Sequence, residues 1–152
     1  MRRGSREQAS VVAAVGGGAL AALGTVLTWF TIEIGGIAAP GGSATGLEGR
    51  DGRTVLAAAI VALLAAGAVV TGRRRVAAKV ALLAAGAVTA IVAVAGIADA
   101  TAKDEEVERE FGIPADRVVA DVGTGLWVVA VAGVSLLGSG AAVTQDGESP
   151  RR

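Results

Sequence analysis

The acidic segment from Asp99 to Asp121 holds the side chains most able to do chemistry. It contains eight carboxylates against three basic residues. Carboxylate oxygens gathered in one segment could hold a divalent cation. The densest group is Asp104, Glu105, Glu106, Glu108 and Glu110. This group lacks the glycine and the alternating ligand spacing of a calcium-binding loop. The sequence therefore assigns no metal site, and it leaves open whether this segment binds a cation, binds a protein or is a solvated surface.

Other reactive side chains are scarce. The chain has no cysteine, histidine or tyrosine, which excludes disulfides, thiol chemistry, haem ligation by histidine and the usual zinc sites. Intramembrane catalysis needs a base beside its nucleophile, and the apolar runs offer only hydroxyls. Those hydroxyls belong to Thr25, Thr28, Thr89, Ser135 and Ser139. We therefore expect no enzyme, no catalytic residue and no cofactor.

The elements that carry these residues are four long apolar runs. With 152 residues, 53% hydrophobic content and a mean hydropathy of +0.61, the chain is long enough for four membrane spans of about 20 residues each. Apolar residues surround each helix, whereas a soluble bundle would show polar stripes. The sequence predicts an all-α membrane protein, an up-down bundle of four transmembrane helices. Their expected positions are about 9–30, 54–71, 76–98 and 122–143, within one domain at 9–144 that has a basic tail at 1–8 and a disordered tail at 145–152.

The basic residues predict the orientation of these helices. Arg73, Arg74 and Arg75 join the second and third runs, and Lys79 lies one turn further on. Short loops rich in Lys and Arg stay in the cytoplasm, and a lysine near a helix end can extend its ammonium to the headgroups. Because both termini are also basic, we expect them to be cytoplasmic in a multi-pass protein of the plasma membrane. The bases are few and lie where topology needs them, so no nucleic-acid partner is expected.

Aromatic and small residues indicate how the helices are anchored and packed. Trp29 and Phe30 end the first run and Trp127 begins the fourth, so all three are expected at the outer membrane interface. Small and hydroxyl residues one turn apart let helices approach closely in lipid. The expected packing residues are Gly17, Gly18, Ala22, Ala85, Thr89, Ser135 and Ser139. They could pack the bundle of one chain or form a face for self-association.

The connections outside the membrane have their own patterns. Residues 30–34 alternate apolar and polar types, and glycines at 35–36 and 41–42 with Pro40 favour turns. We expect a small extracellular β-hairpin whose second strand covers 43–48. Asp51 or Thr54 is the expected N-cap of the second helix. Thr101 with Asp104 resembles a capping box, which indicates a charged helical extension over 103–110.

Three stretches carry a resemblance to a known group of proteins: LTWFTI at 27–32, GLEGRDG at 46–52 and GTGLWVVAVAGVSLLGSG at 123–140. On these stretches the chain resembles small, uncharacterised four-helix membrane proteins of high-GC Gram-positive bacteria. The resemblance implies a claudin-like layout, in which the first outer loop forms a small sheet, and it implies no activity. The first run ends in Thr28-Trp29-Phe30 where the group commonly has Leu-Pro-Trp, so its usual proline is absent.

Two functional hypotheses remain. The first is an integral membrane protein that acts through helix-helix or outer-loop contacts with itself or with a partner membrane protein. The alternative is a small channel, a transporter subunit or a membrane-perturbing effector. An ion path usually has ionisable residues inside the spans. Between the two membrane interfaces these spans offer only hydroxyls, so such a pore would need an oligomer lined by hydroxyls and backbone. The lipid bilayer is an expected partner in either case.

Overall fold

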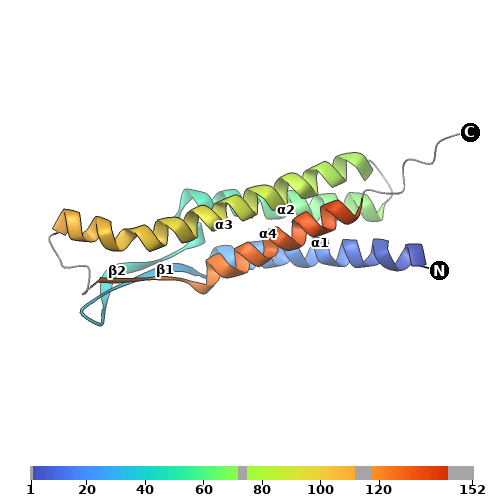
Figure 1. Ribbon diagram of the computed structural model, residues 1–152. Helices are drawn as coiled ribbons and strands as arrows, with labels where there is room; N and C mark the ends of the chain where they lie inside the picture. Colours follow the sequence, from blue (N-terminus) through green and yellow to red (C-terminus); the bar gives the residue numbers. More distant parts are fainter. Residues whose placement is uncertain (1, 72–74, 112–117, 144–152) are drawn as a thin grey trace, which may run out of the picture.

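Four long helices dominate the structure. The computed structural model describes residues 2–71, 75–111 and 118–143 (Figure 1). The helices are α1 (Arg2–Val26), α2 (Arg50–Val70), α3 (Arg75–Phe111) and α4 (Thr124–Ala142). Each contains a stretch long and apolar enough to cross a membrane, at Gln8–Val26, Arg50–Val70, Arg75–Ala102 and Thr124–Ala142. The prediction of four transmembrane helices in a bundle is confirmed to this extent, and the chain is consistent with a multi-pass membrane protein.

The helices form an antiparallel ring. Helix α1 packs against α2 and α4, and α3 packs against the same two neighbours. Figure 1 shows the beginning of α1, the end of α2, the beginning of α3 and the end of α4 together at one end of the bundle. We name this the hinge end. A small β-sheet lies at the other end, which we name the sheet end.

The core of the bundle is built from small side chains. Alanines such as Ala59, Ala62 and Ala132 are fully buried beside a few leucines. A Cβ atom added at Gly133 would lie 2.8 Å from the backbone nitrogen of Ala90, and one at Gly86 would lie 2.8 Å from that of Leu137. Glycine therefore allows the backbones of α3 and α4 to approach closely, as packing between helices in lipid favours.

The sheet contains the predicted hairpin, with a different second strand. Strand β1 (Thr28–Ile34) pairs antiparallel with β2 (Ile37–Thr45). Gly35 and Gly36 have φ angles of 61° and 79°, as a two-residue hairpin turn requires. Because this turn reverses the chain at once, β2 begins at Ile37 and not at 43. The glycines at 41–42, expected in a turn, lie inside β2, whose pairing with β1 is irregular.

A third strand was not predicted. Strand β3 (Val118–Val122) pairs antiparallel with the other side of β1, from Phe30 opposite Val122 to Ile34 opposite Val118. The strand order is β2-β1-β3. The expectation of an all-α chain with only a hairpin is therefore incomplete, because the sheet joins the α1–α2 connection to the α3–α4 connection.

The helix ends also differ from the prediction. Helix α1 ends at Val26 and not at 30, since the chain enters the sheet at Thr28. A 3₁₀-helix, η1 (Gly46–Glu48), stands where the second strand was expected to end. Helix α2 begins at Arg50 with Gly49 as its N-cap, so the predicted caps Asp51 and Thr54 are wrong. The hydroxyl of Thr54 instead donates to the Arg50 carbonyl oxygen at 3.2 Å.

Helix α3 continues far beyond its predicted end at 98. The expected charged extension over 103–110 is helical, but it continues α3 and does not begin a new helix. Thr101 lies inside α3, and its hydroxyl donates to the Ala98 carbonyl oxygen at 2.8 Å, so it is no N-cap. The predictions for Arg73, Arg74 and the tail at 145–152 fall outside the described residues, as do those for the acidic side chains at 104–110.

Candidate functional site

Trp29 lies at the junction between the bundle and the sheet. Its side chain is 7% exposed, and its indole N–H donates to the Gly24 carbonyl oxygen at 2.9 Å. The last carbonyls of a helix lack partners within the helix, so this bond satisfies one orphan acceptor of α1. A Cβ atom added at Gly46 or Gly125 would lie 2.5 Å or 2.7 Å from the Trp29 ring. The ring is therefore enclosed between η1 and α4. Its predicted role at the membrane interface requires an exposed ring, and the Trp29 ring is buried.

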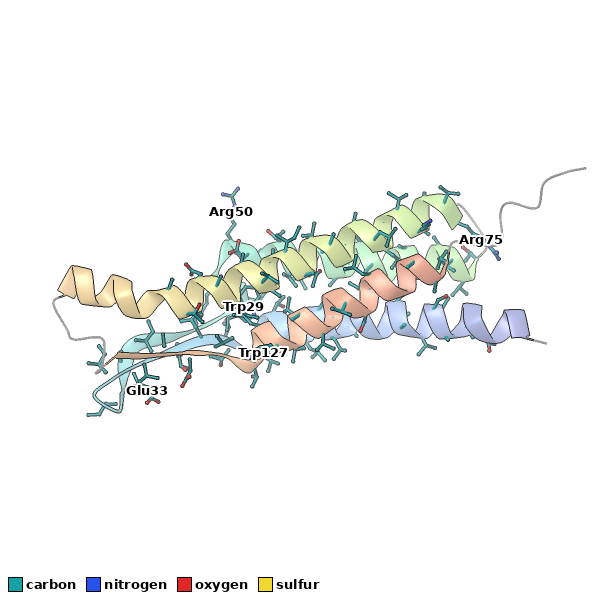
Figure 2. All side chains as sticks on the ribbon, in the orientation of Figure 1. Trp29, Glu33, Arg50, Arg75 and Trp127 are labelled. Carbon is teal, nitrogen blue, oxygen red and sulfur yellow. The ribbon has the colours of Figure 1, made fainter. Side chains whose placement is uncertain are left out.

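The other two predicted anchors lie nearby. Phe30 is partly buried and packs against the same apolar cluster as Trp29. Trp127 begins the second turn of α4 and is 57% exposed, so its ring is at the surface of the sheet end (Figure 2). Of the three aromatic residues, Trp127 has the exposure that an interfacial anchor needs.

A pocket of about 260 Å³ opens beside Trp29. The buried side chains of Trp29, Ala100 and Leu126 line its apolar interior. The pocket is also lined by three exposed carboxylate residues from three elements, Glu48 of η1, Asp51 of α2 and Asp99 of α3. The remaining lining residues are Phe30, Ala44, Thr45, Gly46, Gly49 and Gly96.

Sequence reasoning missed this pocket. Glu48 ends η1 in the α1–α2 connection and Asp51 lies in the first turn of α2, whereas Asp99 lies near the end of the third span. The sequence shows that all three residues are acidic. That they line one pocket depends on how α2 and α3 pack. Among the described residues, no three metal-ligating side chains converge closely enough to hold a metal ion.

Hydrogen bonds to the backbone hold the pocket wall in place. The Glu48 carboxylate accepts from the Thr45 N–H at 3.0 Å, which is one half of a capping box. The Arg53 Nε donates to the Leu47 carbonyl oxygen at 3.4 Å. Figure 2 shows the Arg50 side chain pointing away from the bundle. The exposed Glu48 carboxylate therefore has a backbone partner. Glu33 is exposed on β1.

The predicted packing glycines contact neighbouring helices of the same chain. A Cβ atom at Gly17 would lie 3.1 Å from Leu136 and 3.3 Å from Ser135 of α4. One at Gly18 would lie 3.0 Å from Leu63 of α2. Ala22 packs against the cluster around Trp29, and Ala85 is buried in the cluster nearer the hinge end. These contacts give each residue a role inside one bundle.

The buried hydroxyls are satisfied by their own helices. Thr25 donates to the Ala22 carbonyl oxygen at 2.7 Å, and Thr89 donates to that of Ala85 at 2.8 Å. Ser139 donates to the Leu136 carbonyl oxygen at 2.8 Å. Each bond satisfies a hydroxyl that would otherwise be unpaired in an apolar interior.

Basic side chains mark the hinge end. Arg75 is exposed at the first residue of α3 (Figure 2). Lys79 is partly buried one turn later. Arg75 and Lys79 thus flank the hinge, whereas three carboxylates line the pocket at the sheet end, where Arg50 and Arg53 also lie in the first turn of α2. No protein-family model, curated protein or solved structure matches the chain.

Proposed function

We propose that this chain is a non-enzymatic protein of the plasma membrane that acts by contact between its sheet end and a membrane protein, either a partner or a second copy. In this proposal α1 to α4 cross the bilayer, both termini lie in the cytoplasm and the sheet is extracellular. The orientation is supported by the positive-inside rule, because Arg75 and Lys79 lie at the hinge end.

The observation that carries the proposal is an apolar tip on the sheet. We define the sheet tip as residues 34–37, where Ile34 and Ile37 are cross-strand neighbours on either side of the Gly35-Gly36 turn. Ile37 is 75% exposed. In Figure 1 this turn is the part of the sheet that extends furthest from the helices. Neighbouring apolar side chains that form a contiguous patch outside the bilayer are typical of contact sites.

Exposed apolar residues on the helices have a different explanation. Val12, Leu64, Val94 and Val134 lie on the outside of the four spans, where lipid would surround them. The small residues on the helices already pack inside one bundle. Among the described residues outside the four spans, Ile37 of the sheet tip is the most exposed large apolar residue, and neither lipid nor internal packing explains its exposure.

A photocrosslinking experiment tests the proposal. A benzophenone amino acid replaces Ile37, and a matched variant carries it at Leu64, which is 71% exposed within the α2 span. After irradiation in the native membrane, the Ile37 probe should give a discrete adduct with a membrane protein, identified by mass spectrometry. The Leu64 probe should give mainly lipid adducts. If the two probes give the same products, sheet-end contact is not the function.

A further inference from the structure

We propose that the lipid-facing side of α2 binds an anionic phospholipid of the phosphatidylglycerol class. The phosphate lies at the guanidinium groups of Arg50 and Arg53, and an acyl chain lies along the helix below them. The inference rests on the membrane-spanning arrangement of the proposed function, but it depends neither on the orientation of the chain in the membrane nor on a protein partner.

The two arginines on the first turn of α2 have no acidic partner among the described residues. Both side chains are exposed, and neither forms an ion pair with a described carboxylate. Figure 2 shows Arg50 pointing away from the bundle, and the Arg53 Nε donates to the Leu47 carbonyl oxygen at 3.4 Å. A guanidinium presents its N–H donors in a planar fork that matches phosphate oxygens.

The one carboxylate between them in the sequence lies on another side of the helix. Successive residues of an α-helix are about 100° apart, so Asp51 is about 160° from Arg53 around the axis of α2. Asp51 lines the pocket that α2 shares with α3. Arg50 and Arg53 are only about 60° apart by the same geometry, so both can reach one phosphate.

The arginines lie at the depth of lipid phosphates. Arg50 is the first residue of the α2 span, which runs to Val70. If α2 crosses the bilayer, this end of the span lies at the boundary between the hydrocarbon core and the headgroups. The two guanidinium groups are therefore level with the phosphates of one leaflet.

An exposed apolar stripe leads from Arg53 into the membrane. Ala57, Ile60 and Leu64 follow Arg53 at spacings of four, three and four residues, which keep them on one side of the helix. Ala57 is exposed, Ile60 is 52% exposed and Leu64 is 71% exposed. The rise from Arg53 to Leu64 is about 16 Å, which is half of the hydrocarbon core of about 30 Å. The stripe therefore has the length of one leaflet.

The arginines and the stripe together match a phospholipid better than a soluble phosphate ester. A soluble ester would use the two guanidinium groups and leave the apolar stripe uncovered. The charges favour an anionic headgroup, because basic side chains at a membrane surface attract anionic lipids. The choline of phosphatidylcholine is repelled by two neighbouring arginines, whereas phosphatidylglycerol carries the phosphate charge alone.

Fluorescence quenching by lipid measures binding at a chosen position. Because the chain has no native cysteine, Ala57→Cys can carry a single bimane fluorophore on the stripe. The protein is reconstituted in mixtures of phosphatidylglycerol and phosphatidylcholine, and in each series one of the two lipids carries a nitroxide quencher on its acyl chain. The quenching curves give the ratio of the two binding constants at the fluorophore.

Val131→Cys on α4 is the matched control position. Val131 is 58% exposed and lies seven residues after Thr124, the first residue of α4, as Ala57 lies seven residues after Arg50. The first turn of α4 is uncharged. The two fluorophores therefore lie at similar depths, and only the one on α2 has arginines above it.

We expect phosphatidylglycerol to bind at Ala57 at least about fivefold more strongly than phosphatidylcholine, and the two lipids to bind equally at Val131. Arg50→Gln with Arg53→Gln should abolish the preference at Ala57. Arg50→Lys with Arg53→Lys should retain part of it, because lysine keeps the charge and loses the planar fork. Soluble glycerol phosphate at millimolar concentration should leave the preference unchanged, because it has no acyl chain.

Each of four outcomes would overturn the inference. Equal binding of the two lipids at Ala57 would exclude recognition of the anionic headgroup, and an equal preference at Val131 would reduce it to a general surface charge. An unchanged preference in the double glutamine variant, with circular dichroism showing an intact fold, would exclude the arginines. Loss of the preference on adding glycerol phosphate would assign them to a soluble ester. Failure of the Ile37 crosslink would contradict only the protein contact, because these liposomes contain no partner.

Discussion

Single glycines determine whether the Trp29 ring can be enclosed. A Cβ atom at Gly46 would lie 2.5 Å from this ring, closer than packed atoms tolerate, whereas one at Gly67 on the outside of α2 would have no neighbour within 4 Å. Gly46→Ala should lower the free energy of unfolding by about 1–3 kcal/mol through overpacking. Gly67→Ala should leave it unchanged or raise it by up to about 1 kcal/mol through helix propensity. Unfolding by SDS, followed by tryptophan fluorescence, measures both, and equal stabilities would contradict the enclosed ring.

The residue types at this junction could be read from the sequence, but their surroundings could not. A tryptophan at the end of an apolar run suits a membrane interface, and it also suits a buried position with a hydrogen-bond acceptor. The choice depends on the Gly24 carbonyl and on the space at Gly46 and Gly125, which come from three different elements. The same limit hid the pocket, whose carboxylates lie in separate segments of the chain.

Among the elements, β3 is the one whose pairing can be tested most directly. Its pairing with β1 joins the α3–α4 connection to the α1–α2 connection. The Gly123 N–H donates to the Trp29 carbonyl oxygen at 2.7 Å. Paired residues alternate along an antiparallel ladder, so Ile32 and Ala120 form a pair without hydrogen bonds, with Cα atoms about 4.5 Å apart. This spacing lies within the range for a disulfide.

We therefore expect Ile32→Cys with Ala120→Cys to form a disulfide under mild oxidation, with little background because the chain has no native cysteine. In the control pair, Ile32→Cys with Val119→Cys, the second side chain points to the opposite face of the sheet. Mobility on a non-reducing gel and mass spectrometry of the linked peptides report the bond. Equal yields from the two pairs would contradict the register of β3.

Helices and strands differ in how far the sequence predicts them. Long apolar runs predicted four spans because crossing a bilayer fixes length and composition locally. Their ends were misplaced where tertiary contacts decide them, since α1 stops at Val26 so that Thr28 can pair in the sheet. Strand β3 has five residues, too few for a clear alternation, and its partner β1 is remote in the sequence. A hairpin after β1 was predicted from local turn chemistry, but its second strand was expected at 43–48, whereas the structure turns at Gly35-Gly36 and begins β2 at Ile37.

For the whole molecule, the sheet constrains topology independently of the charges. Because β1, β2 and β3 form one sheet, the α1–α2 and α3–α4 connections must lie on the same side of the membrane. Thr71, at the C-cap of α2, lies at the opposite end of the bundle. The positive-inside rule then decides which side faces the cytoplasm. Among the described residues at the hinge end, it is applied to Arg75 and Lys79.

Three single-cysteine variants test whether the two connections share one side of the membrane and which side faces the cytoplasm. The cysteine replaces Ser43, Thr71 or Thr101, each of which is exposed. A membrane-impermeant maleimide should label Ser43→Cys and Thr101→Cys in intact cells, and should label Thr71→Cys only after permeabilisation. Labelling of Thr71→Cys alone would reverse the orientation and retain the fold, because Ser43 and Thr101 would still behave alike. If Ser43→Cys and Thr101→Cys differ from each other, the two connections lie on opposite sides of the membrane, and one sheet cannot contain strands from both.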